Sequence, residues 1–143
     1  MGWRWMIGCA LIALALIPLE LTAQVRIELT ELRQQIGSVR IALFDAPDNY
    51  LLNPVRALSV KADAKQVSAE INNLPPGRYA FALFHDLNEN GELDRNWLGI
   101  PSEPFAFSNN SMGRFSEPNW EQASFELREV METQNIKLRH LSF

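Results

Sequence analysis

The stretch RYAFALFHD, Arg78 to Asp86, is apolar on both faces of an extended strand. Successive side chains of a strand point to opposite sides. One face carries Tyr79, Phe81 and Leu83, and the other carries Ala80, Ala82 and Phe84. A strand with two apolar faces is typical of the centre of a core. The segment therefore predicts a β fold in which residues 78–86 form a central strand.

Several other segments alternate apolar and polar residues with the same period of two. They are residues 25–30, 39–43, 58–62, 67–71, 104–107, 124–127 and 136–139. Turn signals such as Asn73-Leu74-Pro75-Pro76-Gly77 separate them. About seven short strands without a long helix predict an all-β fold, an antiparallel β-sandwich of immunoglobulin-like or prealbumin-like character. A closed barrel is the alternative, and residues 121–133 leave a choice between extended structure and one or two helical turns.

Two of these segments share a pattern. Ile41-Ala42-Leu43-Phe44-Asp45 resembles Phe81-Ala82-Leu83-Phe84-His85-Asp86, and both end in an acidic residue. Two interpretations stay open: the two strands lie near one another in the fold, or the likeness of a single pair this short is a coincidence.

The first 23 residues have the features of an export signal. Arg4 precedes an apolar run over residues 5–19, and the small residue Ala23 stands at a plausible cleavage point. The run is shorter than the roughly 20 residues that span a bilayer, and Glu20 interrupts it. We therefore expect a signal peptide at residues 1–23, one domain at residues 24–143, and a periplasmic or secreted product without a membrane span.

Charge and cysteine content narrow the classes of partner. The formal net charge is −4 and there is no basic run, so neither nucleic acid nor an anionic lipid surface is expected as a partner. The only cysteine, Cys9, lies inside the predicted signal, so we expect a product without disulfides. Its stability would then depend on the core and on any bound cation.

The segment DLNENGELDRN, residues 86–96, follows the central strand and has the oxygen spacing of a calcium site. We call it the acidic loop. Alternate side-chain oxygens can converge on one hard cation, the glycine at position six permits the sharp turn, and residue seven offers its backbone carbonyl. The spacing predicts structural calcium at positions one, three, five, seven and nine, which are Asp86, Asn88, Asn90, Glu92 and Asp94.

The acidic loop differs from an EF-hand in two ways. A strand precedes it, and Trp97 stands at position twelve, where a bidentate glutamate is expected. A further ligand could come from Glu103, from Asn96 or from water. Because only two of the side-chain ligands are carboxylates, we expect weak affinity, on the order of 10⁻⁵ to 10⁻³ M.

Three other interpretations of this region stay open. A segment rich in Asp, Asn and Gly is also a common polar turn between strands. A hydrolase would use His85 with Asp86 and Asp94, although no nucleophile or orienting group is evident and alternation turns His85 toward the core. A carbohydrate- or small-ligand-binding module would use Trp97 and Trp120 as one surface.

Five motifs lie along the chain after residue 43: Phe44-Asp45, Leu74 to Ala80, Asp86 to Gly91, Gly99 to Glu103, and Phe107 to Asn110. In these motifs the chain resembles a family of exported bacterial proteins catalogued as domain of unknown function 2141. The resemblance implies export, a β-sandwich, and a structural unit made of the acidic loop and residues 99–103. It implies no activity.

Together these observations favour an exported, non-enzymatic β-sandwich with a calcium-stabilised loop. Its role would be binding of an envelope or extracellular ligand. The interpretations as a small-ligand module and as a hydrolase are its alternatives.

Overall fold

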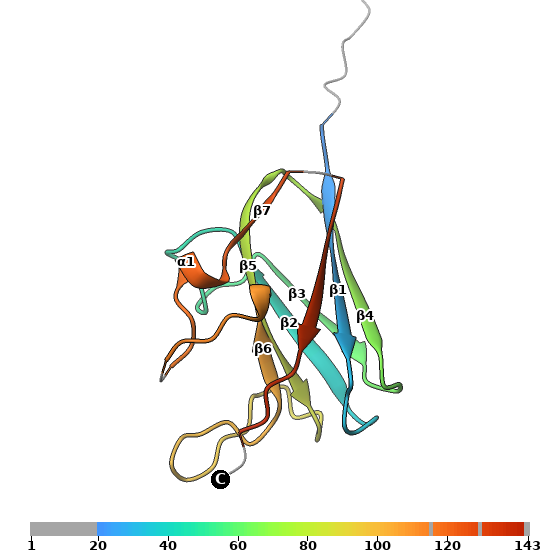
Figure 1. The fold of residues 1–143 in the computed structure, drawn as a ribbon, viewed down its shortest axis with the longest axis vertical. Coiled ribbons are helices and arrows are strands. Elements are labelled where there is room, and N and C mark those ends of the chain that lie inside the picture. Colours follow the sequence, from blue (N-terminus) through green and yellow to red (C-terminus); the bar gives the residue numbers. More distant parts are fainter. Residues whose placement is uncertain (1–19, 115, 129, 142–143) are drawn as a thin grey trace, which may run out of the picture.

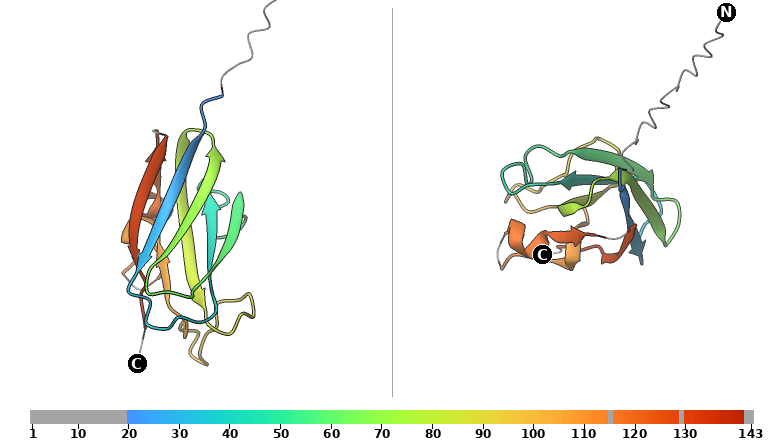
Figure 2. Two further views of the ribbon diagram at one scale, coloured as in Figure 1. Left: turned by 90° about the vertical axis from the view of Figure 1, so that its right-hand side faces the viewer. Right: turned by 90° about the horizontal axis from the view of Figure 1, so that it is seen from above.

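The computed structural model of the chain describes residues 20–141 except 115 and 129. Residues 1–19, which make up most of the predicted signal peptide, lie outside the described part. Eight strands form two layers (Figures 1 and 2). Their bounds are β1 Ala23–Thr30, β2 Ser38–Phe44, β3 Arg56–Lys61, β4 Val67–Leu74, β5 Gly77–Asp86, β6 Phe105–Phe107, β7 Phe125–Leu127 and β8 Met131–Lys137.

The two sheets confirm the predicted all-β sandwich. One sheet has the order β4-β1-β8, and these strands lie side by side in Figure 1. The other has the order β3-β2-β5-β6, and β7 also pairs with β5. As predicted, β5 is central, because it pairs with β2 along one edge and with both β6 and β7 along the other.

One strand pair departs from the predicted antiparallel arrangement. β8 runs parallel to β1, with Gln24 opposite Met131 and Thr30 opposite Lys137, whereas all other strand pairs in the described residues are antiparallel. Parallel neighbours need a long crossover connection. Here almost the whole chain separates the two strands, which local patterning along either one does not reveal.

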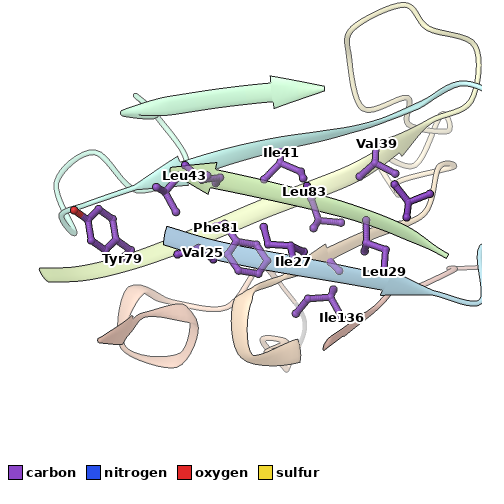
Figure 3. Close-up of a cluster of buried hydrophobic side chains, with 14 of the residues drawn as sticks. Val25, Ile27, Leu29, Val39, Ile41, Leu43, Tyr79, Phe81, Leu83 and Ile136 are labelled. Carbon is purple, nitrogen blue, oxygen red and sulfur yellow. The ribbon is translucent and has the colours of Figure 1, made fainter. Parts of the chain in front are cut away.

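The main core lies between the inner faces of the two sheets. β1 alternates strictly between buried and half-buried residues. Val25, Ile27 and Leu29 of β1 face Val39, Ile41, Leu43, Phe81 and Leu83 of the other sheet (Figure 3). Tyr79 closes one end of this core, and its hydroxyl donates a hydrogen bond of 2.6 Å to the Pro75 carbonyl. A tyrosine bonded to backbone a few residues upstream is a recurrent feature of immunoglobulin-type sandwiches.

The segment that the sequence left open, residues 121–133, divides into three parts. A short helix α1, Trp120–Ala123, comes first, and a reciprocal pair of hydrogen bonds between Asn119 and Gln122 caps its N-terminus. β7 follows, and β8 begins at Met131, earlier than the predicted strand at residues 136–139.

The Phe-Ser-Asn-Asn motif connects the two layers at the end of β6. Ser108 is buried, accepts a hydrogen bond from the Phe81 backbone N–H at 3.0 Å and donates to the Ala123 carbonyl at 2.5 Å. Asn109 exchanges hydrogen bonds with Gln134 of β8, and Asn110 bonds the backbone of the same strand. The motif thus acts through backbone and side-chain hydrogen bonds that fix β8 and α1 relative to β5.

A second, smaller core covers one end of the outer face of the five-stranded sheet. It consists of Phe44, Ala80, Trp120 and Ala123, with Tyr50 packed against them; we call it the Trp120 cluster. The Tyr50 ring centroid lies 5.5 Å from that of Phe44 and 5.8 Å from that of Trp120, both edge to face. Burial, as the larger cause, and the negative charge of Glu117 together raise the pKa of Tyr50 to about 12. The Tyr50 hydroxyl donates a hydrogen bond of 3.0 Å to the Pro118 carbonyl.

Candidate functional site

A groove of about 1170 Å³ lies on the outer face of the five-stranded sheet, beside the Trp120 cluster. We call it the outer groove. Its base is formed by outward-facing residues of β2, β3, β5 and β6. Its sides are formed by Leu93, Arg95, residues 99–101, residues 112–114, Ser116, Glu117, Leu51 and Leu141. The residues that determine its shape and charge are Arg40, Ala42, Ala57, Ala82, Phe84, Arg95, Phe105, Phe107, Arg114 and Glu117.

Strand register explains why the sheet is hollowed here. Ala42 of β2 lies opposite Ala57 of β3 on one side and opposite Ala82 of β5 on the other. Ala82 in turn lies opposite Phe107 of β6. Side chains directly opposite one another share a face of the sheet, so three alanines form a row across three strands. The row leaves methyl groups and the hydrogen-bonded backbone of the sheet at the base of the outer groove.

The next row of the register bounds the outer groove toward the acidic loop. Arg40 lies opposite Ser59 and Phe84, and Phe84 lies opposite Phe105. Arg40 donates from Nε to Asp86 Oδ2 at 2.5 Å. The outer groove therefore lies between the Trp120 cluster at one end and this ion pair at the other.

The groove is richer in positive than in negative charge. Its charged lining residues are Arg40, Arg95, Arg114 and Glu117, three cations and one anion. Arg95 donates from Nη1 to the Gly99 carbonyl at 3.0 Å, and its other terminal nitrogen lies 3.9 Å from Glu117. The whole chain has a net charge of −4, so the positive charge of the groove lining comes from the way the fold brings these arginines together.

Asp86 organises the start of the acidic loop. Its side chain is fully buried, and besides Arg40 it accepts hydrogen bonds from the backbone N–H groups of Asn90 at 3.2 Å and Gly91 at 2.9 Å. Burial alone would raise the pKa of Asp86, but the hydrogen bonds and charge of Arg40 and these N–H groups outweigh it and lower the pKa. Gly91 has φ +84°, which bears out the predicted sharp turn.

Three polar side chains of the acidic loop converge. Asn88 and Asn90 each donate from Nδ2 to one oxygen of Asp94, both at 2.7 Å. The Oδ1 atoms of the two asparagines accept from backbone N–H groups, that of Asn88 from Asn90 and that of Asn90 from Glu92. Four of the five predicted ligand residues thus form a hydrogen-bonded network, with Glu92 joining through its backbone.

The two protein groups considered as further ligands have other roles. Glu103 is buried and accepts from the backbone N–H of Leu87 at 2.9 Å and of Asp94 at 3.1 Å. It therefore joins the two ends of the acidic loop, as expected for one structural unit. Asn96 accepts from the N–H groups of Leu98 and Ile100 and fixes the next turn.

Within the described residues, no group of three or more His, Cys, Asp or Glu side chains is arranged to hold a metal ion. The donor set of the acidic loop is mixed instead: two carboxylates, two side-chain amides and a backbone carbonyl. A cation there would require the amides of Asn88 and Asn90 to rotate so that Oδ1 replaces Nδ2 toward Asp94.

His85 faces the core, as alternation predicts. It is buried, and its Nε2 lies 2.6 Å from the Ile36 carbonyl, to which it donates. The acids named with it in the hydrolase interpretation, Asp86 and Asp94, both accept hydrogen bonds within the acidic loop. His140 is half-buried, and burial, followed by the charges of Arg33 and His85, lowers its pKa.

The two tryptophans do not form one surface. Trp97 is 91 % exposed at the tip of the turn that follows the acidic loop, whereas Trp120 is 8 % exposed inside the Trp120 cluster. The interpretation that both rings bind a ligand together is therefore wrong. Alternation does not reveal this difference, because neither ring lies in a strand.

The residues of the outer groove were not identified from the sequence. Ala42, Ala57 and Ala82 are small residues on separate strands, and only their register makes them neighbours. Arg95 and Arg114 belong to two loops that meet over the sheet. The shared pattern of residues 41–45 and 81–86 was the available signal: proximity of the two strands was one of its two interpretations, and β2 does pair with β5.

The described residues contain no helix long and apolar enough to cross a membrane. The chain matches, over residues 27–135, the family described as an uncharacterized protein conserved in bacteria (DUF2141). No curated protein matches it. Among solved structures it is similar to the C-terminally truncated tip fimbrial protein Mfa3 from Porphyromonas gingivalis, with 10 % identity and a TM-score of 0.47. That match covers 83 % of this chain and 48 % of the Mfa3 chain, or about half its length. The chain belongs to the DUF2141 family.

Proposed function

We propose that this member of the DUF2141 family is an exported, non-enzymatic binding protein that holds a small ligand in its outer groove. The observation that carries the proposal is the groove itself, an open space of about 1170 Å³ with an apolar base and sides made by two loops. Ligand sites are concave and mostly apolar, with a few polar groups that orient the ligand.

Packing on the two faces of β5 supports a binding role for the outer face. The inner face is covered by the other sheet, and the Trp120 cluster covers one end of the outer face. Between that cluster and Arg40, the alanine row leaves apolar surface open to solvent. Covering such surface is favourable by about 25 cal/mol per Å², which gives an apolar ligand a reason to bind there.

Export follows from the proposed signal at residues 1–23, and we place the product in the periplasm or outside the cell. A binding protein in that compartment would meet envelope or extracellular ligands. Processing of the chain tests this part: mass spectrometry of the protein from the soluble periplasmic or culture fraction should find Gln24 as the first residue. A chain that keeps residues 1–23 would contradict it.

We also propose that the acidic loop binds calcium through Asp86, Asn88, Asn90, Glu92 and Asp94. The oxygen spacing and the convergence of Asn88, Asn90 and Asp94 support the proposal. The nearby Arg40 guanidinium already neutralises Asp86 and would weaken the site. The ion would stabilise one side of the outer groove, because Leu93 and Arg95 of the acidic loop line it.

Filling the base of the outer groove tests the binding function. Ala57 is exposed on the edge strand β3, so an Ala57→Phe ring can enter the groove without disturbing the core. We expect the affinity for a neutral apolar dye such as Nile red, measured by fluorescence titration, to fall about tenfold, equivalent to about 1.4 kcal/mol.

The matched control is Thr133→Phe, which adds the same ring to an exposed position of β8 in the other sheet. It should leave dye affinity unchanged. Equal affinities in the wild type and both variants would place dye binding elsewhere and would overturn the proposal that the outer groove is the binding site.

A further inference from the structure

We propose that the free edge of β3 binds an extended acidic peptide as an additional antiparallel strand, and that apolar side chains of this peptide enter the outer groove. β3 is the last strand on its side of the five-stranded sheet, and no described strand pairs with its outer edge. The inference rests on the proposed function in one respect, because the groove would receive side chains of the peptide. It adds a binding surface, the strand edge, that lies beside the groove.

The backbone of β3 shows which of its residues face this edge. The Ala62 N–H donates to the Gly37 carbonyl at 3.0 Å, so the residue directly after β3 points its backbone groups toward β2. The backbone groups of successive strand residues point to alternate edges. Ala57, Ser59 and Lys61 therefore point theirs away from β2, because the register between the two strands has no shift that would interrupt the alternation. These residues offer about six backbone hydrogen bonds to an added strand.

Two of the same residues also line the outer groove. Ala57 ends the alanine row, and Ser59 lies in the next row, opposite Arg40. A residue of an added antiparallel strand would lie directly opposite each of them, with its Cβ about 4.5–5.5 Å away on the same face. An aromatic side chain there would extend over the Ala57 methyl group into the groove, where Leu51 is a further exposed apolar residue. The edge and the groove thus form one continuous surface.

The charges at the two ends of β3 favour an acidic peptide. Arg56 and Lys61 are both exposed. Arg56 donates to the carbonyl of the preceding residue, and neither side chain forms a salt bridge with another described residue. Basic residues on an edge strand oppose its pairing with a second copy of itself, because like charges then meet. A strand with acidic ends would instead neutralise them.

The free edge of β4, in the other sheet, lacks these features. Its exposed residues include Ser68 and Glu70, which already bond to the neighbouring strand: Ser68 to Glu28, and Glu70 to Arg26. No residue of β4, all of which the structure describes, lines the outer groove. A peptide strand has therefore more to bind at β3 than at β4.

Fluorescence anisotropy with the purified protein tests the pairing. The probe is the heptapeptide ETFTFTE, labelled with fluorescein at its N-terminus and amidated. Its phenylalanines would lie opposite Ala57 and Ser59, and in antiparallel pairing their N–H groups face β3 while those of the threonines face away. We expect methylation of both phenylalanine backbone nitrogens to weaken binding at least about tenfold. Methylation of the first and last threonine nitrogens should change it less than about twofold.

The basic peptide KTFTFTK, with the same label, tests the charge preference. We expect it to bind at least about tenfold more weakly than ETFTFTE. The difference should shrink as salt is raised. Arg56→Gln together with Lys61→Gln should remove the preference.

Matched proline variants test the edge from the side of the protein. Ser59→Pro removes one outward N–H, and edge strands accept proline at such positions. It should weaken ETFTFTE binding at least about tenfold. The control is Ser68→Pro on the edge of β4, which should leave binding unchanged. The Gln24 N–H donates to the carbonyl of residue 130, directly before β8, so the next residue, Val25, faces β4. Its partner Ile71 faces back, and alternation turns the Ser68 N–H to the free edge.

The outcomes separate this inference from the proposed function. Equal binding of the two methylated peptides would overturn pairing with the strand edge. Absence of peptide binding, together with Nile red binding that Ala57→Phe weakens, would overturn this inference and keep the proposed function. Peptide binding that depends on the phenylalanine N–H groups, without any Nile red binding, would do the reverse. A dimer in sedimentation velocity that Ser59→Pro converts to a monomer would show that a second copy occupies the edge and would overturn the inference.

Discussion

The paired strands β2 and β5 end in similar sequences but at very different sites. Ala42 lies opposite Ala82, and from this point Phe44 and Phe84 extend along the outer face in opposite directions. Phe44 is buried within the Trp120 cluster, whereas Phe84 is half-buried and lines the outer groove. Similar local patterns therefore occur at a closed end and at an open end of one sheet face.

The acids that follow these phenylalanines differ in the same way. Asp45 is exposed and accepts a hydrogen bond from the Asn49 side chain. Asp86 is fully buried and accepts hydrogen bonds from Arg40 and from two backbone N–H groups of the acidic loop. The difference shows that the partners supplied by the neighbouring strand and by the returning loop determine whether a strand-end acid is structural.

The largest effect is expected at the closed end. Trp120→Ala should lower the free energy of unfolding by about 3–5 kcal/mol, because it leaves a cavity between Tyr50, Phe44 and Ala123. Urea unfolding followed by far-UV circular dichroism measures it. Trp97→Ala is the matched control and should stay within about 0.5 kcal/mol of the wild type, since that ring is exposed. Equal costs for the two variants would remove the distinction between the two tryptophans.

The next largest effect is expected at the buried acid. Asp86→Asn keeps the size of the side chain but replaces one acceptor oxygen with a donor facing Arg40 and the loop N–H groups. We expect a loss of about 2–3 kcal/mol in the free energy of unfolding by urea. Asp45→Asn should cost less than about 0.5 kcal/mol. A larger cost at residue 45 than at residue 86 would reverse the comparison between the strand ends.

Calcium should stabilise only the open end, through the acidic loop. Its effect on the free energy of unfolding should be smaller than that of Trp120→Ala or Asp86→Asn. With a dissociation constant of about 10⁻⁴ M, calcium at about 1 mM stabilises the fold by about 1.4 kcal/mol, which raises the melting temperature by about 5 °C. Calorimetry with calcium, magnesium and chelator measures the shift. Asp94→Asn should abolish it while leaving the buried contacts of Asp86 in place. The same shift with magnesium, or in Asp94→Asn, would contradict the calcium proposal.

The smallest effect is a change with pH. The pKa of Asp86 is lowered in the folded protein, so its contribution is complete above the unfolded value of 3.8 and is lost as pH falls through the folded value. The stability difference between wild type and Asp86→Asn should therefore be constant from pH 5 to 7 and shrink below about pH 4. Urea unfolding at each pH measures it, and a difference that grows on acidification would show the opposite shift.

Particular residues show how far the sequence predicted the candidate site. The acidic loop was recognised as one unit from its spacing, and the hydrogen bonds of Asp86 to the N–H groups four and five residues later follow that spacing. The family resemblance implied that residues 99–103 and the acidic loop form one unit, but the individual hydrogen bonds of Glu103 to Leu87 and Asp94 were not predicted, because they bridge 16 and 9 residues of chain. Arg40 was missed because its partner Asp86 lies 46 residues away.

The sequence by itself determined the all-β fold, the central place of β5 and the turn at Gly91, because these depend on alternation and local backbone preferences within a few residues. Tertiary structure decided the rest. Register brought Ala57, Ala42 and Ala82 into one row, and two loops carried Arg95 and Arg114 over it. Contacts between distant segments also buried Trp120 and exposed Trp97. Such contacts depend on how whole strands pair, and a strand shifted by one residue would turn its side chains to the opposite face.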